Sequence, residues 1–147
     1  MNNDTSTTVG TAVPANQVIA RIAQHLAHQK QLAVGPSGMC TYRSLDGAAC
    51  AVGCLISDTA ACSVEGFTAL QIFEEPSGAR TELISLARAE GYQPQKFFDL
   101  LSEFQAYHDN EIDDSYSLRL SQTQDEDELL ALITQDLNLI LIWSNSQ

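Results

Sequence analysis

The chain has 147 residues, of which 44% are hydrophobic, enough for one domain with its own core and too many for wholesale disorder. Nineteen acidic side chains against seven basic ones give a net charge of −12, which excludes a surface that attracts nucleic acid or anionic membranes by charge. Most of this excess lies in residues 101–147, which contain ten acids and one base.

The first twenty residues contain neither a basic start nor a continuous apolar run, so no export signal is predicted. The longest apolar run, Leu139 to Trp143, is too short to cross a bilayer. We therefore expect a cytoplasmic protein with reduced thiols. For reduced cysteines, metal binding, catalysis or plain burial is more expected than disulfide formation. The four cysteines are Cys40, Cys50, Cys54 and Cys62.

Residues 1–13 are rich in Asn, Thr and Ser and are predicted to be a disordered lead-in, with one domain over 14–147. A helix is predicted from about Pro14 to Lys30, and the run Gly35-Pro36-Ser37-Gly38 ends it. Its apolar residues recur at the spacing of one helical face: Val18, Ile19, Ile22, Ala23 and Leu26.

A β-hairpin is predicted next. Met39 to Arg43 reads as a short strand, Asp46-Gly47 as a turn, and Cys50 to Ile56 as the return strand.

The length of this turn decides where the cysteines point. A two-residue turn places Cys50 and Cys54 on one face and Cys40 on the other. A three-residue turn, Leu45 to Gly47, places all three on one face, because a one-residue change of register reverses every side chain. Both registers are open.

Residues 59–77 are ambiguous, with one helical turn expected around Thr68 to Phe73. Further helices are predicted over 81–89, 94–108 and about 125–140. Thr123 and Glu126 have the spacing of a capping box, and Leu137 to Trp143 also has strand character. The predicted fold class is therefore α+β: a mostly helical single domain of four or five helices around one antiparallel β-hairpin.

In the three-residue register, the inward-facing His108 could complete a zinc set of Cys40, Cys50, Cys54 and His108. A catalytic site would instead use Cys40 or Cys50 with His108. Asp109 directly follows His108, and neighbouring helical side chains diverge, which argues against a Cys-His-Asp triad. Small buried thiols and a hydrogen-bonded core histidine are favoured over both sites. No cofactor is expected, and whether the protein is an enzyme stays open, with a binding role favoured.

The chain also carries a motif in two parts. The first is Cys40-x-Tyr42-Arg43, then Asp46-Gly47, then Cys50-Ala51-x-Gly53; the second is Gln105-x-x-His108-Asp109. Together they resemble a family of small uncharacterised proteins encoded by tailed bacteriophages, prophages and related mobile elements. Phe104 stands where that family has Leu. The resemblance covers roughly 30 of the 147 residues and implies the cytoplasm of a bacterial host as the setting, with no activity to transfer.

This setting favours an inhibitor of a bacterial defence complex, of the anti-CRISPR type, because CRISPR effectors hold nucleic acid in a basic channel. The expected partner is a bacterial protein or ribonucleoprotein with a basic surface, without direct binding to nucleic acid or membrane. The alternative is a Cys/His site protein, either a thiol hydrolase or a structural zinc binder. The acids expected to contact the partner are Asp109, Glu111, Asp113, Asp114, Asp125, Glu126, Asp127 and Glu128.

Overall fold

The computed structural model describes residues 16–31, 42, 48–109 and 116–146, and these residues form helices, turns and loops without a strand. The predicted α+β class is therefore wrong. The described elements are seven α-helices and one 3-10 turn: α1 (Asn16–Gln29), η2 (Gly53–Leu55), α2 (Asp58–Ser63), α3 (Ala69–Glu74), α4 (Gly78–Ala89), α5 (Pro94–His108), α6 (Tyr116–Gln122) and α7 (Glu126–Asn145).

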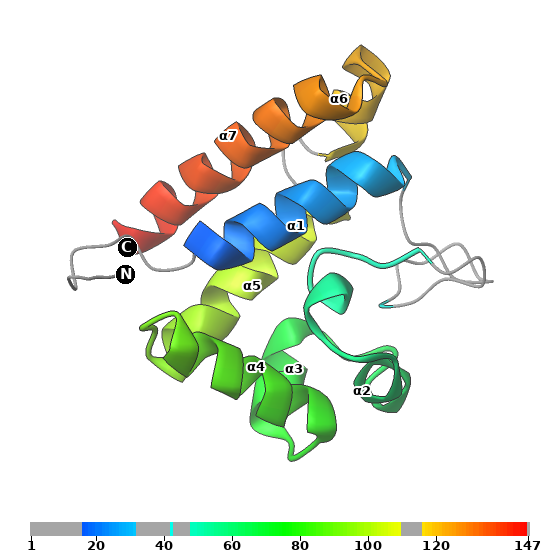
Figure 1. Cartoon of the computed structure of the whole chain (residues 1–147). Coiled ribbons are helices and arrows are strands. Elements are labelled where there is room, and N and C mark those ends of the chain that lie inside the picture. The colour runs from blue at the N-terminus through cyan, green and yellow to red at the C-terminus, as the bar shows by residue number, and fades with distance from the viewer. Residues whose placement is uncertain (1–15, 32–41, 43–47, 110–115, 147) are drawn as a thin grey trace, which may run out of the picture.

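Two long helices, α1 and α7, run side by side in opposite directions (Figure 1). His28 near the end of α1 accordingly lies beside Glu126 at the start of α7, with 3.4 Å between Nδ1 and Oε1. The helix α5 packs against α3, α4, α6 and α7. It therefore connects the α1–α7 pair to the shorter helices α2, α3 and α4 at the other end of the molecule (Figure 1).

The core forms from the helical faces that periodicity indicates. In α1, Val18, Ile22 and Leu26 are fully buried, as the spacing predicts. In α5, the large apolar and aromatic side chains are also fully or almost fully buried: Phe97, Phe98, Leu100, Leu101, Phe104 and Tyr107. Burial of each large apolar side chain contributes about 1.5–3 kcal/mol, so these two faces supply much of the stabilisation.

The helix α7 differs from its prediction at both ends. Asp125 caps it, because its Oδ1 accepts the N–H of Glu128 at 2.9 Å. The predicted capping box of Thr123 and Glu126 is therefore wrong: Thr123 Oγ1 instead accepts the N–H of Asp125. The strand character of Leu137 to Trp143 is also overruled, since every fourth residue from Leu129 to Leu141 is buried against the core. Across the described part of the chain, no helix combines the length and apolarity needed to cross a membrane.

The predicted hairpin is contradicted at its return strand. Residues 50–56 form successive tight turns, in which the Cys50 carbonyl accepts the N–H of Cys54 at 3.0 Å and the Val52 carbonyl accepts that of Leu55 at 3.0 Å. These are helical hydrogen bonds, which strand geometry does not allow. Of the predicted first strand and turn, only Tyr42 is among the described residues, so the question of turn length lies outside them, as does the predicted lead-in.

Two short helices were not predicted. Ser57 caps the start of α2, because its Oγ accepts the N–H of Ala60 at 3.2 Å. Glu82 of α4 fixes this cap, because its carboxylate accepts both the N–H and the hydroxyl of Ser57, at 2.8 and 2.7 Å. Helix α6 carries the base of a buried ion pair described below. Helices of six or seven residues are too short to show a clear period in the sequence.

Candidate functional site

The segment from Ala48 to Ile56 is held by polar side chains of two helices. Gln29 of α1 binds both backbone groups of Ala49: its Oε1 accepts the N–H at 2.8 Å and its Nε2 donates to the carbonyl at 3.0 Å. His25 Nε2 lies 2.8 Å from the same carbonyl. Gln105 of α5 accepts the N–H of Val52 at 3.1 Å. These side chains take the place of a partner strand, which is why the segment need not form a sheet.

Gln105 continues this network to the end of α5. Its Nε2 donates to Asp109 Oδ1 at 2.8 Å, and His108 Nδ1 lies 2.8 Å from the same oxygen. Because a carboxylate only accepts hydrogen bonds, this contact assigns a proton to Nδ1. The His108 ring is fully buried and stacks on Tyr116, with 5.8 Å between ring centroids.

The expectation that Asp109 diverges from His108 is therefore wrong. Asp109 is the C-cap residue of α5, with φ −80° and ψ 2°, and lies just beyond the regular helix. The divergence of neighbouring side chains by about 100° holds only inside a helix, so the Asp109 side chain is able to return to His108.

Cys50 lies beside this network and is fully buried. Burial raises the pKa of its thiol from the ordinary value of 9.0 to about 12, and the negative charge of Asp109 acts in the same direction. Hydrogen bonds from the Gly53 N–H, at 3.3 Å, and from Gln105 oppose that shift without cancelling it. The thiol is consequently protonated at neutral pH and is a poor nucleophile.

The other cysteines are dispersed. Cys54 is partly buried and donates its thiol proton to the Ala51 carbonyl at 3.2 Å, while Cys62 on α2 is exposed. Within 16–31, 42, 48–109 and 116–146, no three His, Cys, Asp or Glu side chains are grouped to hold a metal ion. Cys40, which the zinc and catalytic hypotheses both use, lies outside the described residues.

Tyr42, which precedes the tight turns of residues 50–56 in the chain, lies in the same region. It is buried, its hydroxyl donates to the Phe67 carbonyl, and its N–H donates to Glu65 Oε1 at 3.1 Å. Burial raises the pKa of its hydroxyl, and the negative charge of Asp109 acts in the same direction. The two parts of the motif thus meet in space through Gln105. In the sequence, the only indication of this role is the position of Gln105 in the Gln-x-x-His-Asp pattern.

We predict that Gln105→Leu lowers the free energy of unfolding by about 2–4 kcal/mol, because the substitution leaves the Val52 N–H and Asp109 without this partner. Gln95→Leu on the same helix is a matched control. Gln95 also bonds a carboxylate four residues on, Asp99 at 3.2 Å, but at an exposed position, so we expect a cost below about 0.5 kcal/mol. Urea unfolding measures both. Equal costs would show that the network has no special stabilising role.

A second buried polar cluster joins α5, α6 and α7. Arg119 of α6 binds Asp136 of α7 through two hydrogen bonds of 2.8 Å, from Nε to Oδ2 and from Nη2 to Oδ1. The Tyr107 hydroxyl donates to Asp136 Oδ2 at 2.7 Å. This cluster was not predicted from the sequence, although Asp136 stands between Ile133 and Leu137 on the apolar face of α7, where a charge requires a partner.

The predicted acidic surface divides into three groups. Asp125, Glu126, Asp127 and Glu128 are all exposed at the start of α7, and we call these four residues the acidic end. Asp109 instead turns inward, with 19% of its side chain exposed. The remaining three acids, Glu111, Asp113 and Asp114, lie outside the described residues.

The acidic end is poorly neutralised. Glu126 contacts His28, whose side chain is 81% exposed, at 3.4 Å. Among the described residues, Asp127 and Glu128 have no ion-pair partner. Arg119, the one base in residues 101–147, is bound to Asp136. Within the part of the chain that the structure describes, the start of α7 therefore carries several negative charges without a basic partner.

Comparisons with protein-family models, with curated proteins and with solved structures found no match for this chain.

Proposed function

We propose that this protein acts by binding, as a mobile-element inhibitor of a bacterial defence complex that presents its acidic end to a basic protein surface. The partner is a bacterial protein or ribonucleoprotein such as a CRISPR effector, whose nucleic acid channel is basic. One observation carries the proposal: four consecutive exposed acids begin α7, while the nearest base in the sequence, Arg119, is occupied by Asp136.

Charge and geometry both suit this role. The positive pole of the α7 dipole offsets only about half a charge, so the acidic end retains a strong negative potential. Four acids within little more than one helical turn give a charge density comparable to that of adjacent phosphates. Such a surface speeds encounter with a basic groove and competes there with nucleic acid.

The buried network supports binding over thiol hydrolysis. A hydrolase would require a thiolate that substrate can reach, whereas Cys50 is fully buried with its pKa raised to about 12. His108 is likewise fully buried, between Asp109 and the Tyr116 ring. The burial of Cys50 and His108 is therefore typical of side chains that pack a core.

Neutralising the acidic end tests the proposal. The variant Glu126→Gln/Asp127→Asn/Glu128→Gln removes three negative charges and keeps the Asp125 cap. At about 0.5 kcal/mol for each surface ion pair, we expect inhibition of target-DNA binding by purified CRISPR effectors to weaken about tenfold. Inhibition by the unaltered protein should also weaken as salt rises from 50 to 500 mM.

A control with the same loss of charge separates local from overall effects. Glu74→Gln/Glu75→Gln/Glu90→Gln removes three acids from α3, the loop after it and the end of α4, away from α7. This variant should inhibit as well as the unaltered protein. The proposal fails if a panel of effectors shows no inhibition, if both variants behave alike, or if inhibition is independent of salt.

A further inference from the structure

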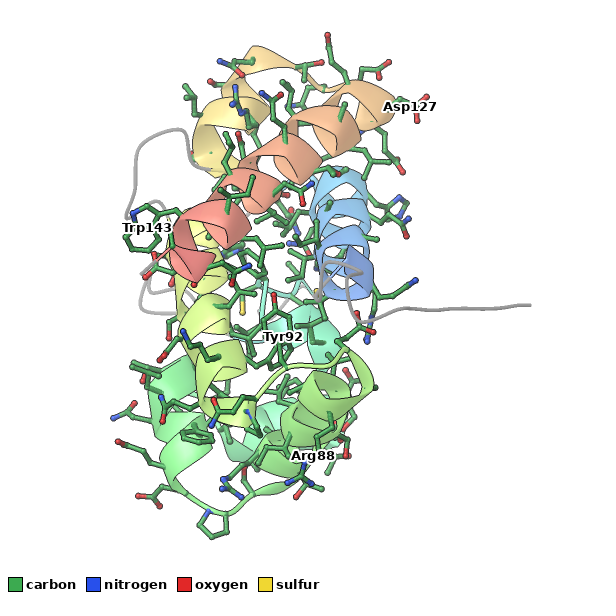
Figure 2. All side chains as sticks on the ribbon, turned by 90° about the vertical axis from the view of Figure 1, so that its left-hand side faces the viewer. Arg88, Tyr92, Asp127 and Trp143 are labelled. Atoms are coloured by element: carbon green, nitrogen blue, oxygen red, sulfur yellow. The ribbon has the colours of Figure 1, made fainter. Side chains whose placement is uncertain are left out.

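Three large apolar side chains form a stripe on the outer face of α7 near its end. Leu139, Ile142 and Trp143 are 57%, 66% and 52% exposed. Their spacing of three and four residues places them on one side of the helix. Figure 2 shows Trp143 pointing away from the body of the molecule, at the opposite end of α7 from Asp127. We call these three residues the apolar stripe.

The apolar stripe lies in a part of the sequence without charge. Residues 137–147 contain no Asp, Glu, Lys or Arg, so all 26 charged side chains of the protein precede them. The nearest acid along the chain, Asp136, is buried against Arg119. In a molecule with a net charge of −12, the end of the longest helix therefore presents an apolar stripe and contributes no charged side chain of its own.

We propose that the apolar stripe binds a second copy of this chain, with the two α7 helices packed antiparallel about a two-fold axis near Ile142. The apolar stripe contains no carboxylate with which a basic partner could pair. Two acidic molecules, however, are able to meet there without bringing charged side chains of their α7 helices into contact. A two-fold axis makes the interface self-complementary, so one stripe serves both sides.

The antiparallel direction follows from the position of the acidic end. Asp127 precedes Ile142 by 15 residues, which is about 22 Å along the helix. Antiparallel packing separates the two acidic ends by about 45 Å, several times the screening length of about 8–10 Å. Parallel packing would place the eight acids of the two acidic ends side by side.

The size of the stripe predicts a reversible dimer. Three side chains exposed by about half or more offer on the order of 300 Å² of apolar surface for each copy. A stable interface buries about 800 Å² for each partner, so we expect self-association at tens of micromolar. Screening of the net charge should strengthen the dimer as salt rises, whereas binding through the acidic end should weaken.

Sedimentation velocity from 5 to 500 µM protein, in 50 and 500 mM NaCl, tests the dimer. We expect the mass to rise from 16.0 kDa toward twice that value, and more completely at high salt. Trp143 is the only tryptophan, so its emission should shift to shorter wavelength as the dimer forms and the ring leaves water. This emission change needs no variant.

Ile142→Glu places one carboxylate from each copy at the axis and should raise the dimer Kd at least tenfold. Leu70→Glu is the matched control, because Leu70 is 41% exposed on α3, and it should leave the Kd unchanged. A monomer at 500 µM in 500 mM NaCl overturns the proposal, as does a dimer equally strong in Ile142→Glu, or a dimer that leaves Trp143 emission unchanged. Inhibition of an effector is measured separately, so neither proposal stands on the other.

Discussion

Replacing Asp136 with alanine is expected to lower the free energy of unfolding by about 3–5 kcal/mol, a large part of the 5–15 kcal/mol typical of a domain. The substitution removes both hydrogen bonds that Arg119 makes to this carboxylate, and the acceptor of the Tyr107 hydroxyl. It thus leaves the partly buried guanidinium of Arg119 and the buried hydroxyl of Tyr107 without that partner. For a chain of this length, the melting temperature should fall by about 10–15 °C.

Two further variants separate a lost ion pair from a general weakness of α7. Asp127→Ala removes an exposed acid of the same helix and should cost no more than about 0.5 kcal/mol. The double variant Arg119→Met/Asp136→Leu removes both charges and should recover much of the stability lost in Asp136→Ala, since paired apolar groups tolerate burial. A cost below about 1 kcal/mol for Asp136→Ala would contradict the assigned role.

Cys50 is expected to react with iodoacetamide at pH 7.5 at least about a thousandfold more slowly than Cys62. A pKa of about 12, against an ordinary 9.0, reduces the thiolate fraction by about that factor, and burial slows access further. Cys62 is exposed on α2 and sets the reference rate. Mass spectrometry of peptides after timed alkylation measures both rates, and similar rates would contradict the buried position of Cys50.

The same shift makes stability depend on alkaline pH. Below about pH 9, the Cys50 thiol is neutral in both the folded and the unfolded chain. In that range it therefore does not make the free energy of unfolding depend on pH. Between pH 9 and 12 the unfolded chain loses the proton while the folded chain keeps it, so stability falls as pH rises. The variant Cys50→Ala should lose less stability over this window than the unaltered chain, measured by urea unfolding at each pH.

The long helices could be predicted because their signal is local. In α1 and α5, apolar residues repeat at helical spacing, and Pro94 marks the start of α5. The existence and the approximate bounds of these two helices therefore follow from residues that are close in the sequence. The repeat also predicts α7, although the stretch Leu137 to Trp143 at its end also has strand character. The buried positions from Leu129 to Leu141 show that packing against the core decided that ambiguity.

The hairpin was predicted from local features that the tertiary structure overrides. Asp46-Gly47 and the apolar run from Cys50 to Ile56 are typical of a strand and its turn. The small residues of this region nevertheless fit between α1 and α5, where Gln29 and Gln105 supply hydrogen bonds to the backbone. Gln29 is twenty residues from Ala49, and Gln105 is 53 from Val52, beyond the reach of any local pattern.

By itself, the sequence determined the concentration of negative charge in the last third, the long amphipathic helices and the residues of the two-part motif. Only the tertiary structure decided which charges act inside the protein. It turned Asp109 toward His108, paired Asp136 with Arg119, and left the acidic end and the apolar stripe exposed. The reason is physical: helical periodicity depends on neighbours three and four residues apart, whereas the partner of a polar group depends on which distant segments the core brings together.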